Sequence, residues 1–433
     1  MNEHSVNPFS LNLFHNFPYL VHHKGDTYNL KEGMAMAFFM IILFVLLVTV
    51  WIRLDFSLGY SRHLRNNGPM LYPYRNGDIQ FFSDGQEFYQ HYFQSLQNAR
   101  SSIYVSFYIV KGDEEISQTF LTILGKKAQE GLQVYLLLDR LGSLKASNKI
   151  LKQIQRQGVH FSYSHTPKFP CFFFTLQARN HRKISVIDCQ TGYLGGYNIG
   201  KEYIGKNPKL GYWRDYHLSF TGAGIQDLLE QFQRDWNQTG ANRFHLPEIS
   251  AEASGTVRYR FISTYGKALD DQFLSFIHRA KREIIICSPY FIPGSKLQTE
   301  LLRALERGVK VRIIVPMRSD HLLVKEAAFP YYGPLLKAGA KIHRFYPGFY
   351  HAKIILIDEA FCDIGTANFD KRSMYLNDEM NAFIEDRAFA EKVRASILKD
   401  IHDSEQLLYE DYLKRPYVQR VKEKAATFVS LFL

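Results

Sequence analysis

The chain is poor in cysteine. Four cysteines occur in 433 residues, and no two of them form a CxxC pair. Disulfide-dependent secreted domains and structural zinc sites need more cysteines at closer spacings. A disulfide framework and a zinc module are therefore not expected. The four cysteines stand among apolar or motif residues, which predicts small buried side chains in a reducing compartment: Cys171, Cys189, Cys287 and Cys362.

Acidic residues are outnumbered by basic ones. The chain has 42 Asp and Glu against 53 Lys and Arg, which gives a formal net charge of +11. A positive balance favours nucleic acid, an anionic membrane surface or a phosphate-bearing substrate, although it can also serve solubility alone. A dense basic stripe interleaved with aromatics is missing, so nucleic acid is not the expected partner. The chain is 46% hydrophobic, which allows two or three domains with large cores.

A single hydrophobic run is long enough to cross a bilayer. Residues 34–52, "MAMAFFMIILFVLLVTVWI", are 19 residues without a charge, and Trp51 and Arg53 are typical of a membrane interface. The alternative is a buried helix of a soluble domain. A small excess of basic residues after the run predicts a single-pass cell-membrane protein with its C-terminal bulk in the cytoplasm. Residues 1–33 form a segment to which the sequence assigns no role.

Two stretches of the chain spell nearly the same phrase. They are "HRKISVIDCQTGYLGGYN", which begins at His181, and "HAKIILIDEAFCDIGTAN", which begins at His351, 170 residues later. Each contains His-x-Lys-x4-Asp, with Gly at offset 14 and Asn at offset 17 from the histidine. One copy of so short a pattern is weak evidence. Two copies with matching offsets indicate a duplicated functional element.

The surroundings of the two phrases also correspond. "ARSSIYVSFYIV" and "EGLQVYLLLDRLGS" precede the first, and "AKREIIICSPYFI" and "RGVKVRIIVPMRSD" precede the second. β-branched runs that alternate with amphipathic helices predict an α/β fold with mixed, mainly parallel sheets flanked by helices. We therefore predict a duplicated domain around a pseudo-twofold site, with halves at 67–250 and 251–400 and a helical tail at 401–433.

Histidine and lysine two positions apart on a strand face the same way. If the two phrases meet, two histidines and two lysines converge, and this set suits a phosphodiester. Lysines and asparagines neutralise and hold the phosphate oxygens, one imidazole attacks phosphorus, and the other transfers protons. Neither a metal nor a cofactor is needed. The predicted set is His181, Lys183, Asn198, His351, Lys353 and Asn368.

Each catalytic histidine should have a carboxylate that orients its second ring nitrogen. Asp215 in "WRDYHL" and Glu379 in "LNDEMN" are the candidates. Asp188 and Asp358 complete the two motifs and are counted with the catalytic set. Because they lie an odd seven positions from their histidines, they should face away from them and shape the following turn.

The doubled motif resembles that of the phospholipase D superfamily, and the flanking phrases resemble those of its bacterial cardiolipin synthases. The resemblance spans about residues 84–386 and rests on these stretches: "SFYIVKGDE", "LLLDRLGS", "NHRKISVID", "GGYNIGKEY", "WRDYHLSFTG", "SPYFIP", "RGVKVRIIVPMRSD", "FYHAKIILID" and "GTANFDKRSMYLNDEMN". Members of that family often have two N-terminal spans, whereas this chain has one strong span, so its topology departs from the pattern.

The resemblance implies phosphatidyl transfer from one phosphatidylglycerol to another, which gives cardiolipin and glycerol. By position, His181 would be the nucleophile and His351 the acid and base, although symmetry alone does not decide between them. Lys183, Lys353 and the two asparagines would bind phosphate. The expected partners are phosphatidylglycerol and anionic membrane lipid. The sequence does not decide whether the second phospholipid is phosphatidylglycerol or phosphatidylethanolamine.

Three apolar segments suggest a lipid substrate, although each can equally be ordinary core. They are residues 168–174, 329–336 and 345–350. The last residues, from Tyr417, predict a basic amphipathic helix that lies on anionic lipid or docks on the domain. Other functions stay open: a phospholipase D that uses water, a membrane-tethered nuclease or phosphodiesterase, and a scaffold without activity.

Overall fold

The computed structural model describes residues 24–112, 114–247 and 255–432. The chain divides into two compact units, Met1–Leu54 and Asp55–Leu433. Most of the N-terminal segment predicted at 1–33 lies outside the described residues. The predicted boundary between the halves, at 250 and 251, also lies outside them.

A single long helix carries the apolar run. Helix α1 (Lys24–Asn66) begins in the first unit and ends in the second. In the described part of the chain, it is the one helix that is long and apolar enough to cross a membrane. Its side chains from Met34 to Leu47 are exposed, with Phe44 67% exposed. The predicted span at residues 34–52 lies within this helix, which suits a hydrocarbon environment.

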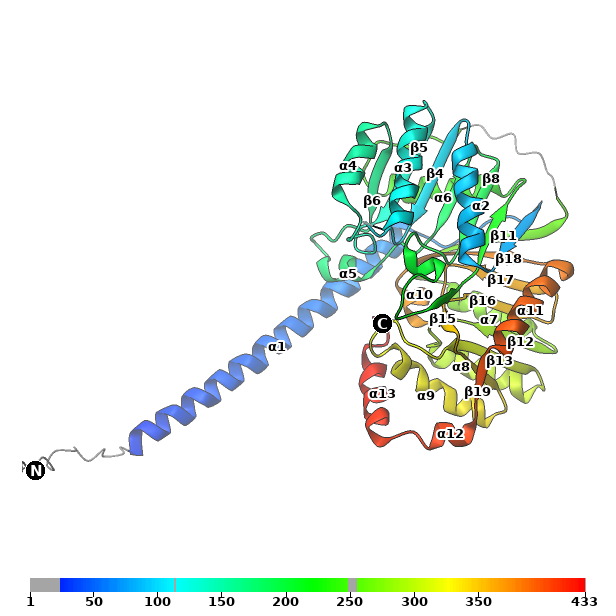
Figure 1. The fold of residues 1–433 in the computed structure, drawn as a ribbon. Coiled ribbons are helices and arrows are strands. Elements are labelled where there is room, and N and C mark those ends of the chain that lie inside the picture. The colour runs from blue at the N-terminus through cyan, green and yellow to red at the C-terminus, as the bar shows by residue number, and fades with distance from the viewer. Residues whose placement is uncertain (1–23, 113, 248–254, 433) are drawn as a thin grey trace, which may run out of the picture. The chain divides into compact units, whose positions relative to one another are not determined.

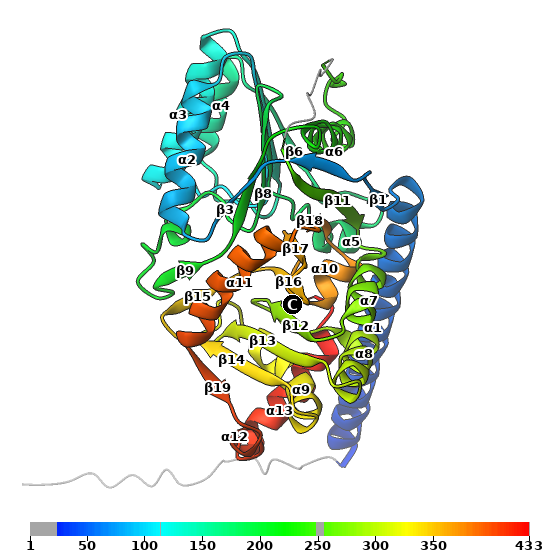
Figure 2. The ribbon, with the colours of Figure 1, turned by 90° about the vertical axis from the view of Figure 1, so that its right-hand side faces the viewer.

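The first half of the second unit is built on a seven-stranded sheet in the order β3-β10-β8-β7-β4-β5-β6. Three helices cover one face of this sheet and α6 (Ile225–Asn237) covers the other (Figure 2). The covering helices are α2 (Gly85–Asn98), α3 (Glu115–Gln129) and α4 (Asn148–Arg156). The strands are β3 (Ile79–Phe82), β4 (Ser102–Phe107), β5 (Gln133–Asp139), β6 (His160–Ser164), β7 (Ile184–Ile187), β8 (Thr191–Gly195) and β10 (His217–Phe220).

The second half repeats this plan on a ten-stranded sheet in the order β1-β11-β18-β17-β16-β12-β13-β14-β19, with β2 also paired to β11. Helices α7 (Leu269–Arg279), α8 (Gly294–Glu306) and α9 (Val324–Lys337) cover one face, and α11 (Arg387–His402) covers the other. The strands are β1 (Met70–Leu71), β2 (Arg75–Gly77), β11 (Val257–Tyr265), β12 (Glu283–Cys287), β13 (Lys310–Pro316), β14 (Lys341–Phe345), β16 (Ile354–Ile357), β17 (Phe361–Gly365), β18 (Asp378–Ile384) and β19 (Ser404–Leu407).

The duplicated α/β plan with mixed sheets is confirmed, but the expectation of mainly parallel strands is wrong. Parallel pairing is confined to β4-β5-β6 in the first sheet and β12-β13-β14 in the second. Helical crossovers connect those strands, as parallel pairing requires. Strands β7 and β16, which follow the His-Lys phrases, instead turn straight back into β8 and β17, and the remaining pairs of both sheets are also antiparallel.

The core of the second unit forms three main clusters. One lies between the first sheet and α2–α4, and another lies between the second sheet and α7–α9. The third is shared by the two halves, because it joins the inner faces of both sheets with α6 and α11. Strands β1 and β2 fall in the range predicted for the first half, yet they pair with β11 of the second sheet. The halves are therefore joined by a continuous interior.

Short elements complete the fold around the interface of the halves. Strands β9 (Tyr212–Arg214) and β15 (Gly348–Tyr350) pair in parallel and connect the two halves directly. The remaining elements are α5 (Phe172–Gln177), the 3-10 helix η1 (Lys201–Ile204), α10 (Lys371–Tyr375), α12 (Tyr409–Leu413) and α13 (Tyr417–Val429), which lies beside α9 (Figure 1). All four cysteines are free; Cys287 and Cys362 are buried as predicted, whereas Cys171 and Cys189 are only half-buried.

Candidate active site

The two histidines of the repeated phrase reach one cavity. His181 stands just before β7 and His351 just before β16, so each sits at the entrance of the equivalent strand in its half. Both line a cavity with a volume of about 540 Å³, together with Asn198 and Asn368. The duplication thus brings together residues that are 170 positions apart in the chain.

Backbone hydrogen bonds tie each histidine to the opposite half. His181 N donates to the carbonyl of Asp378 at 2.9 Å, and His351 N donates to the carbonyl of Arg214 at 2.7 Å. Asp378 and Arg214 directly precede the two predicted orienting carboxylates. The pseudo-twofold arrangement therefore exchanges the carboxylates between the halves.

The side chains follow this exchange. His181 Nδ1 lies 3.0 Å from both carboxylate oxygens of Glu379, and His351 Nδ1 lies 2.5 Å from Asp215 Oδ2. A carboxylate accepts from Nδ1–H, which selects the tautomer whose Nε2 carries the free lone pair. Each imidazole consequently presents Nε2 as its reactive nitrogen.

Hydroxyl groups hold Glu379 in place. Thr366 Oγ1 donates to one of its oxygens at 2.6 Å, and Ser373 Oγ donates to the other at 2.9 Å. Asp215 accepts from the backbone N–H of Tyr216 at 2.8 Å. Sequence reasoning missed both hydroxyl residues, although they stand within the quoted "GTANFDKRSMYLNDEMN".

The two lysines are fully buried beside the histidines, but they contact them differently. Lys183 Nζ donates to the His181 carbonyl at 2.7 Å and lies over the Tyr108 ring. Lys353 Nζ donates to the His351 carbonyl at 2.5 Å, and it lies 2.8 Å from His351 Nδ1 and 3.3 Å from His351 Nε2. It is also 3.6 Å from Asp215 Oδ2. Both ammonium groups therefore lie in a water-poor interior behind the histidines that line the cavity.

Burial dominates the proton affinities of these groups. It lowers the pKa of His181 to about 4 and that of His351 to about 3, because a charged imidazole loses hydration there and the lysines repel it. Burial also lowers the pKa of Lys183 to about 7. Burial alone would raise the pKa of Asp215, but Lys353 and His351 hold it below its usual value. Both imidazoles are thus neutral at pH 7.

The two asparagines differ in how they are held. Asn198 Oδ1 accepts from the backbone N–H of Ile109, and its amide nitrogen lies 3.3 Å from the Tyr203 hydroxyl. Asn368 is also buried at the cavity wall, and its Oδ1 has no hydrogen-bond partner among the described residues. Both side chains therefore stand where a phosphate oxygen can reach them.

Asp188 and Asp358 lie at the far ends of the His-Lys strands from the histidines. Asp188 accepts from the backbone N–H groups of Arg100, Ser101 and Ser102 at 2.7–3.0 Å. Asp358 makes the equivalent bonds to residues 281–283 at 2.8–2.9 Å. Both carboxylates thus clamp the β7–β8 and β16–β17 turns to the start of the neighbouring strand.

Aromatic and charged residues that the sequence did not single out complete the cavity. Tyr108 packs edge-on against His181 with ring centroids 5.0 Å apart, and Trp213 lies 4.8 Å from His351. Lys111 and Arg372 also line the cavity. These residues appear within the quoted "SFYIVKGDE", "WRDYHLSFTG" and "GTANFDKRSMYLNDEMN", but periodicity gives no sign that they face the site.

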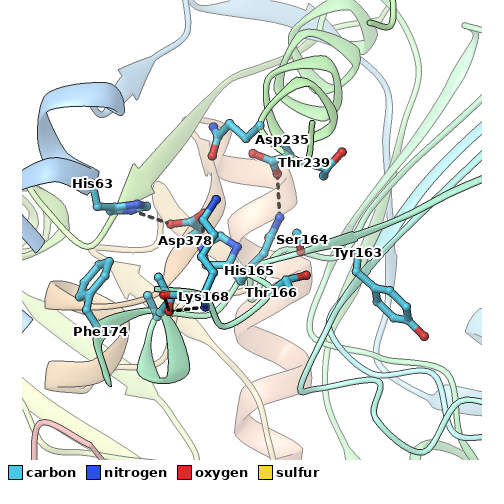
Figure 3. Close-up of a pocket in the computed structure, with 14 residues that line it drawn as sticks. His63, Tyr163, Ser164, His165, Thr166, Lys168, Phe174, Asp235, Thr239 and Asp378 are labelled. Carbon is cyan, nitrogen blue, oxygen red and sulfur yellow. Dashed lines mark hydrogen bonds and ion pairs between the residues drawn. The ribbon is translucent and has the colours of Figure 1, made fainter. Parts of the chain in front are cut away.

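A second, smaller cavity of about 170 Å³ lies next to the site (Figure 3). Asp378 is buried at its wall, with His63 Nε2 at 3.3 Å and His165 Nε2 at 3.2 Å. Burial opposes ionisation of Asp378, but His165, Arg182 and His63 keep its pKa well below the usual value. Because the carbonyl of Asp378 accepts from the backbone N–H of His181, this network braces the segment that carries His181.

The three apolar segments differ in how far the structure buries them. Residues 329–336 lie in α9, where Phe329 and Tyr332 are buried core residues, so of the two alternatives left open for this segment the structure shows ordinary core packing. In residues 345–350, Phe345, Phe349 and Tyr350 are also buried, although Tyr346 is half-exposed. Only the segment around α5 keeps a fully exposed aromatic ring, Phe169, at 76% exposure.

Comparison with known proteins identifies the family to which the chain belongs. The family described as "Cardiolipin synthase, PLD-like domain" matches residues 92–236 and 273–401. The minor cardiolipin synthase ClsB of Bacillus subtilis (strain 168) is 41% identical over 396 residues, which cover 92% of this chain and 99% of that protein. The major cardiolipin synthase ClsA of the same organism is 36% identical over 368 residues, which cover 83% of this chain and 76% of that protein.

A solved structure shows the same fold. Phosphatidylserine synthase from Haemophilus influenzae Rd KW20 superposes with a TM-score of 0.64 at 17% sequence identity, covering 86% of this chain and 100% of that chain. At this identity the likeness concerns the fold alone. The family match and the relatives over 30% identical decide the membership: the chain belongs to the cardiolipin synthase family of phospholipase D-like phosphatidyltransferases.

Proposed function

We propose that this protein is a cardiolipin synthase that moves a phosphatidyl group from one phosphatidylglycerol to another through a phosphohistidine on His181. The observation that carries the proposal is the shared cavity, where two buried imidazoles each receive a carboxylate from the opposite half. Family membership supports the choice of lipid.

In the first step, Nε2 of His181 attacks the phosphorus of phosphatidylglycerol. A P–N bond forms and the P–O bond to glycerol breaks, and His351 donates a proton to the departing glycerol oxygen. Glu379 stabilises the positive charge that develops on His181. The lysines and asparagines neutralise the phosphate oxygens in a site where burial strengthens each contact.

In the second step, a hydroxyl of a second phosphatidylglycerol headgroup attacks the same phosphorus. His351 removes the proton from that hydroxyl, the P–N bond breaks, and cardiolipin leaves with His181 free again. Arrival of the anionic phosphate raises the pKa of His351, because the negative charge favours the imidazolium. This shift makes His351 available as the acid of the first step.

The choice of His181 as the nucleophile rests on its position in the first phrase, as the family resemblance implies. The lysine contacts do not decide between the histidines, because Lys183 and Lys353 each donate to the carbonyl of their own histidine. Lys353 Nζ also lies 2.8 Å from Nδ1 and 3.3 Å from Nε2 of His351.

We further propose that the chain crosses the cell membrane once through α1, with its catalytic unit on the cytoplasmic face and anionic lipid as its partner. Arg53, Arg62 and Arg65 follow the apolar run closely, which agrees with a cytoplasmic C-terminal side. Such an anchor would keep the catalytic unit at the membrane that contains its phosphatidylglycerol substrate.

The test is to give the purified protein phosphatidylglycerol vesicles and identify the products by mass spectrometry, with His181→Ala as the control. Cardiolipin and an equal amount of glycerol are expected from the native protein alone. Phosphatidic acid without cardiolipin would make water the acceptor. Absence of lipid turnover would refute the proposal and direct attention to oligonucleotide substrates.

A further inference from the structure

Helix α13 docks on the protein through its polar stripe. Glu423, Ala426 and Ser430 are buried, and they recur at intervals of three and four residues. Glu423 pairs with Arg415 at 2.8 Å, and Ser430 accepts from Lys371 Nζ at 2.9 Å. Such an ion pair and hydrogen bond fix the rotation of the helix about its own axis.

The apolar stripe of α13 consequently points outward. Val418 is 64% exposed, Val421 is 51% exposed and Phe428 is 89% exposed, again at helical spacing. An amphipathic surface helix normally buries its apolar stripe and exposes its polar one. Here the orientation is reversed, so the apolar face requires a partner outside the folded unit.

The charges around this face identify the partner. Arg420, Lys422 and Lys424 are exposed, whereas Glu423, the single acidic residue of α13, faces inward and is paired. An exposed apolar stripe flanked by basic side chains matches the headgroup region of an anionic bilayer. An acidic groove on a partner protein would complement the basic side chains, but it gives no reason for the aromatic ring of Phe428 to be 89% exposed.

The stripe continues to the catalytic cavity. Phe432 lies 5.7 Å from Phe173 and 5.8 Å from Phe56 by ring centroids, and it lines the cavity. The carbonyl of Phe432 accepts from Arg372, which also lines the cavity. Leu322, 85% exposed, lines it as well. A surface that includes α13 would thus place the opening of the cavity against lipid.

We propose that the outward face of α13, from Val418 through Phe428 to Phe432, lies in the headgroup region of an anionic leaflet. This contact is additional to the apolar run of α1, and it holds the cavity opening at the lipid surface. It is an interaction surface and does not depend on which reaction the cavity performs.

The test uses the full chain in nanodiscs with a nitroxide label at Val421→Cys or Phe428→Cys. The half-buried Cys171 and Cys189 are replaced by serine so that the label is specific. Leu398→Cys on α11 is the matched control, because Leu398 is an exposed leucine on a different helix. Collision with oxygen and with a water-soluble nickel chelate reports whether each label lies in lipid or in water.

In discs of equal parts phosphatidylglycerol and phosphatidylcholine, labels at 421 and 428 should collide with oxygen and be shielded from nickel. The label at 398 should show the opposite. In discs of pure phosphatidylcholine, the ratio of oxygen collision to nickel collision at 421 and 428 should be several-fold lower.

Nickel access at 421 and 428 equal to that at 398 would overturn the proposal. Shielding from both reagents would also overturn it, because it would indicate a protein partner. Equal depth in both lipids would refute the anionic preference. None of these readouts needs turnover, so failure here is separate from failure of the proposed reaction.

Discussion

Replacing Asp215 with asparagine should impair the histidine of the opposite half and spare the histidine of its own half. Asp215 accepts from His351 Nδ1 at 2.5 Å and from Tyr216 N at 2.8 Å, and Lys353 lies 3.6 Å away. An asparagine offers one acceptor oxygen where Asp215 offers two. Its NH2 group must therefore face either His351 Nδ1–H or the Tyr216 N–H, and that donor loses its acceptor. The substitution also removes the charge that stabilises protonated His351.

The expected loss can be bounded from these contacts. A hydrogen bond to a charged group contributes about 1.5–3 kcal/mol. Loss of a positioned acid and base typically costs about 10²–10⁴-fold in rate. With phosphatidylglycerol as substrate, we therefore expect Asp215→Asn to lower kcat by about 10²–10⁴-fold. Glu379→Gln should lower kcat by a similar factor.

A phosphatidyl ester of p-nitrophenol separates the two variants. Its leaving group departs without a proton, so the first step needs His181 and Glu379 but not His351 and Asp215. In rapid-mixing absorbance measurements, His351→Ala and Asp215→Asn should each release one equivalent of p-nitrophenolate in a burst and then stall. His181→Ala and Glu379→Gln should show no burst. If His351→Ala keeps the burst while Asp215→Asn loses it, the exchange of carboxylates between the halves is refuted.

Three further predictions rest on the same geometry. With the p-nitrophenyl ester, whose first step needs no acid, the second-order rate constant of the burst should fall below about pH 4, where His181 takes up a proton, and above about pH 7, where buried Lys183 loses one; a flat profile between pH 3 and 9 would contradict these assignments. Turnover should survive EDTA, because lysines and histidines supply the charge and the protons; loss that an added metal restores would contradict this. Asp188→Asn should lower the free energy of unfolding by about 1–3 kcal/mol, since the amide cannot accept from the same backbone N–H groups as strongly; calorimetry measures this, and an unchanged melting temperature would remove Asp188 from its role as a clamp. Because nearby partners hold the pKa of Asp188 below its usual value, this stability should be lost as the pH falls through that lowered pKa.

Local pattern predicted a large part of this protein. The two phrases at His181 and His351 indicated duplication and the paired site, because chemistry needs the same side chains at the same offsets in each half. The uncharged run at 34–52 predicted the long apolar helix, because bilayer thickness sets the length of a span. Asp188 and Asp358 were expected to shape the turns after their strands, and each binds backbone N–H groups beside such a turn. Strand alternation is not the reason for their position, because both follow the strand in a turn with positive φ.

Such local patterns could not predict the contacts between segments that are distant in the sequence. The sequence named Asp215 and Glu379 but not their partners, because the exchange arises only when β9 meets β15 and β18 meets the first phrase. The hairpins after β7 and β16 made the sheets mostly antiparallel, and apolar runs read alike in both kinds of sheet. In α13 the amphipathic stripe was visible in the sequence, but which face turns outward was decided by Arg415 and Lys371, residues that bind its polar side. Periodicity determines which residues share a face, and only the packed fold determines what that face meets.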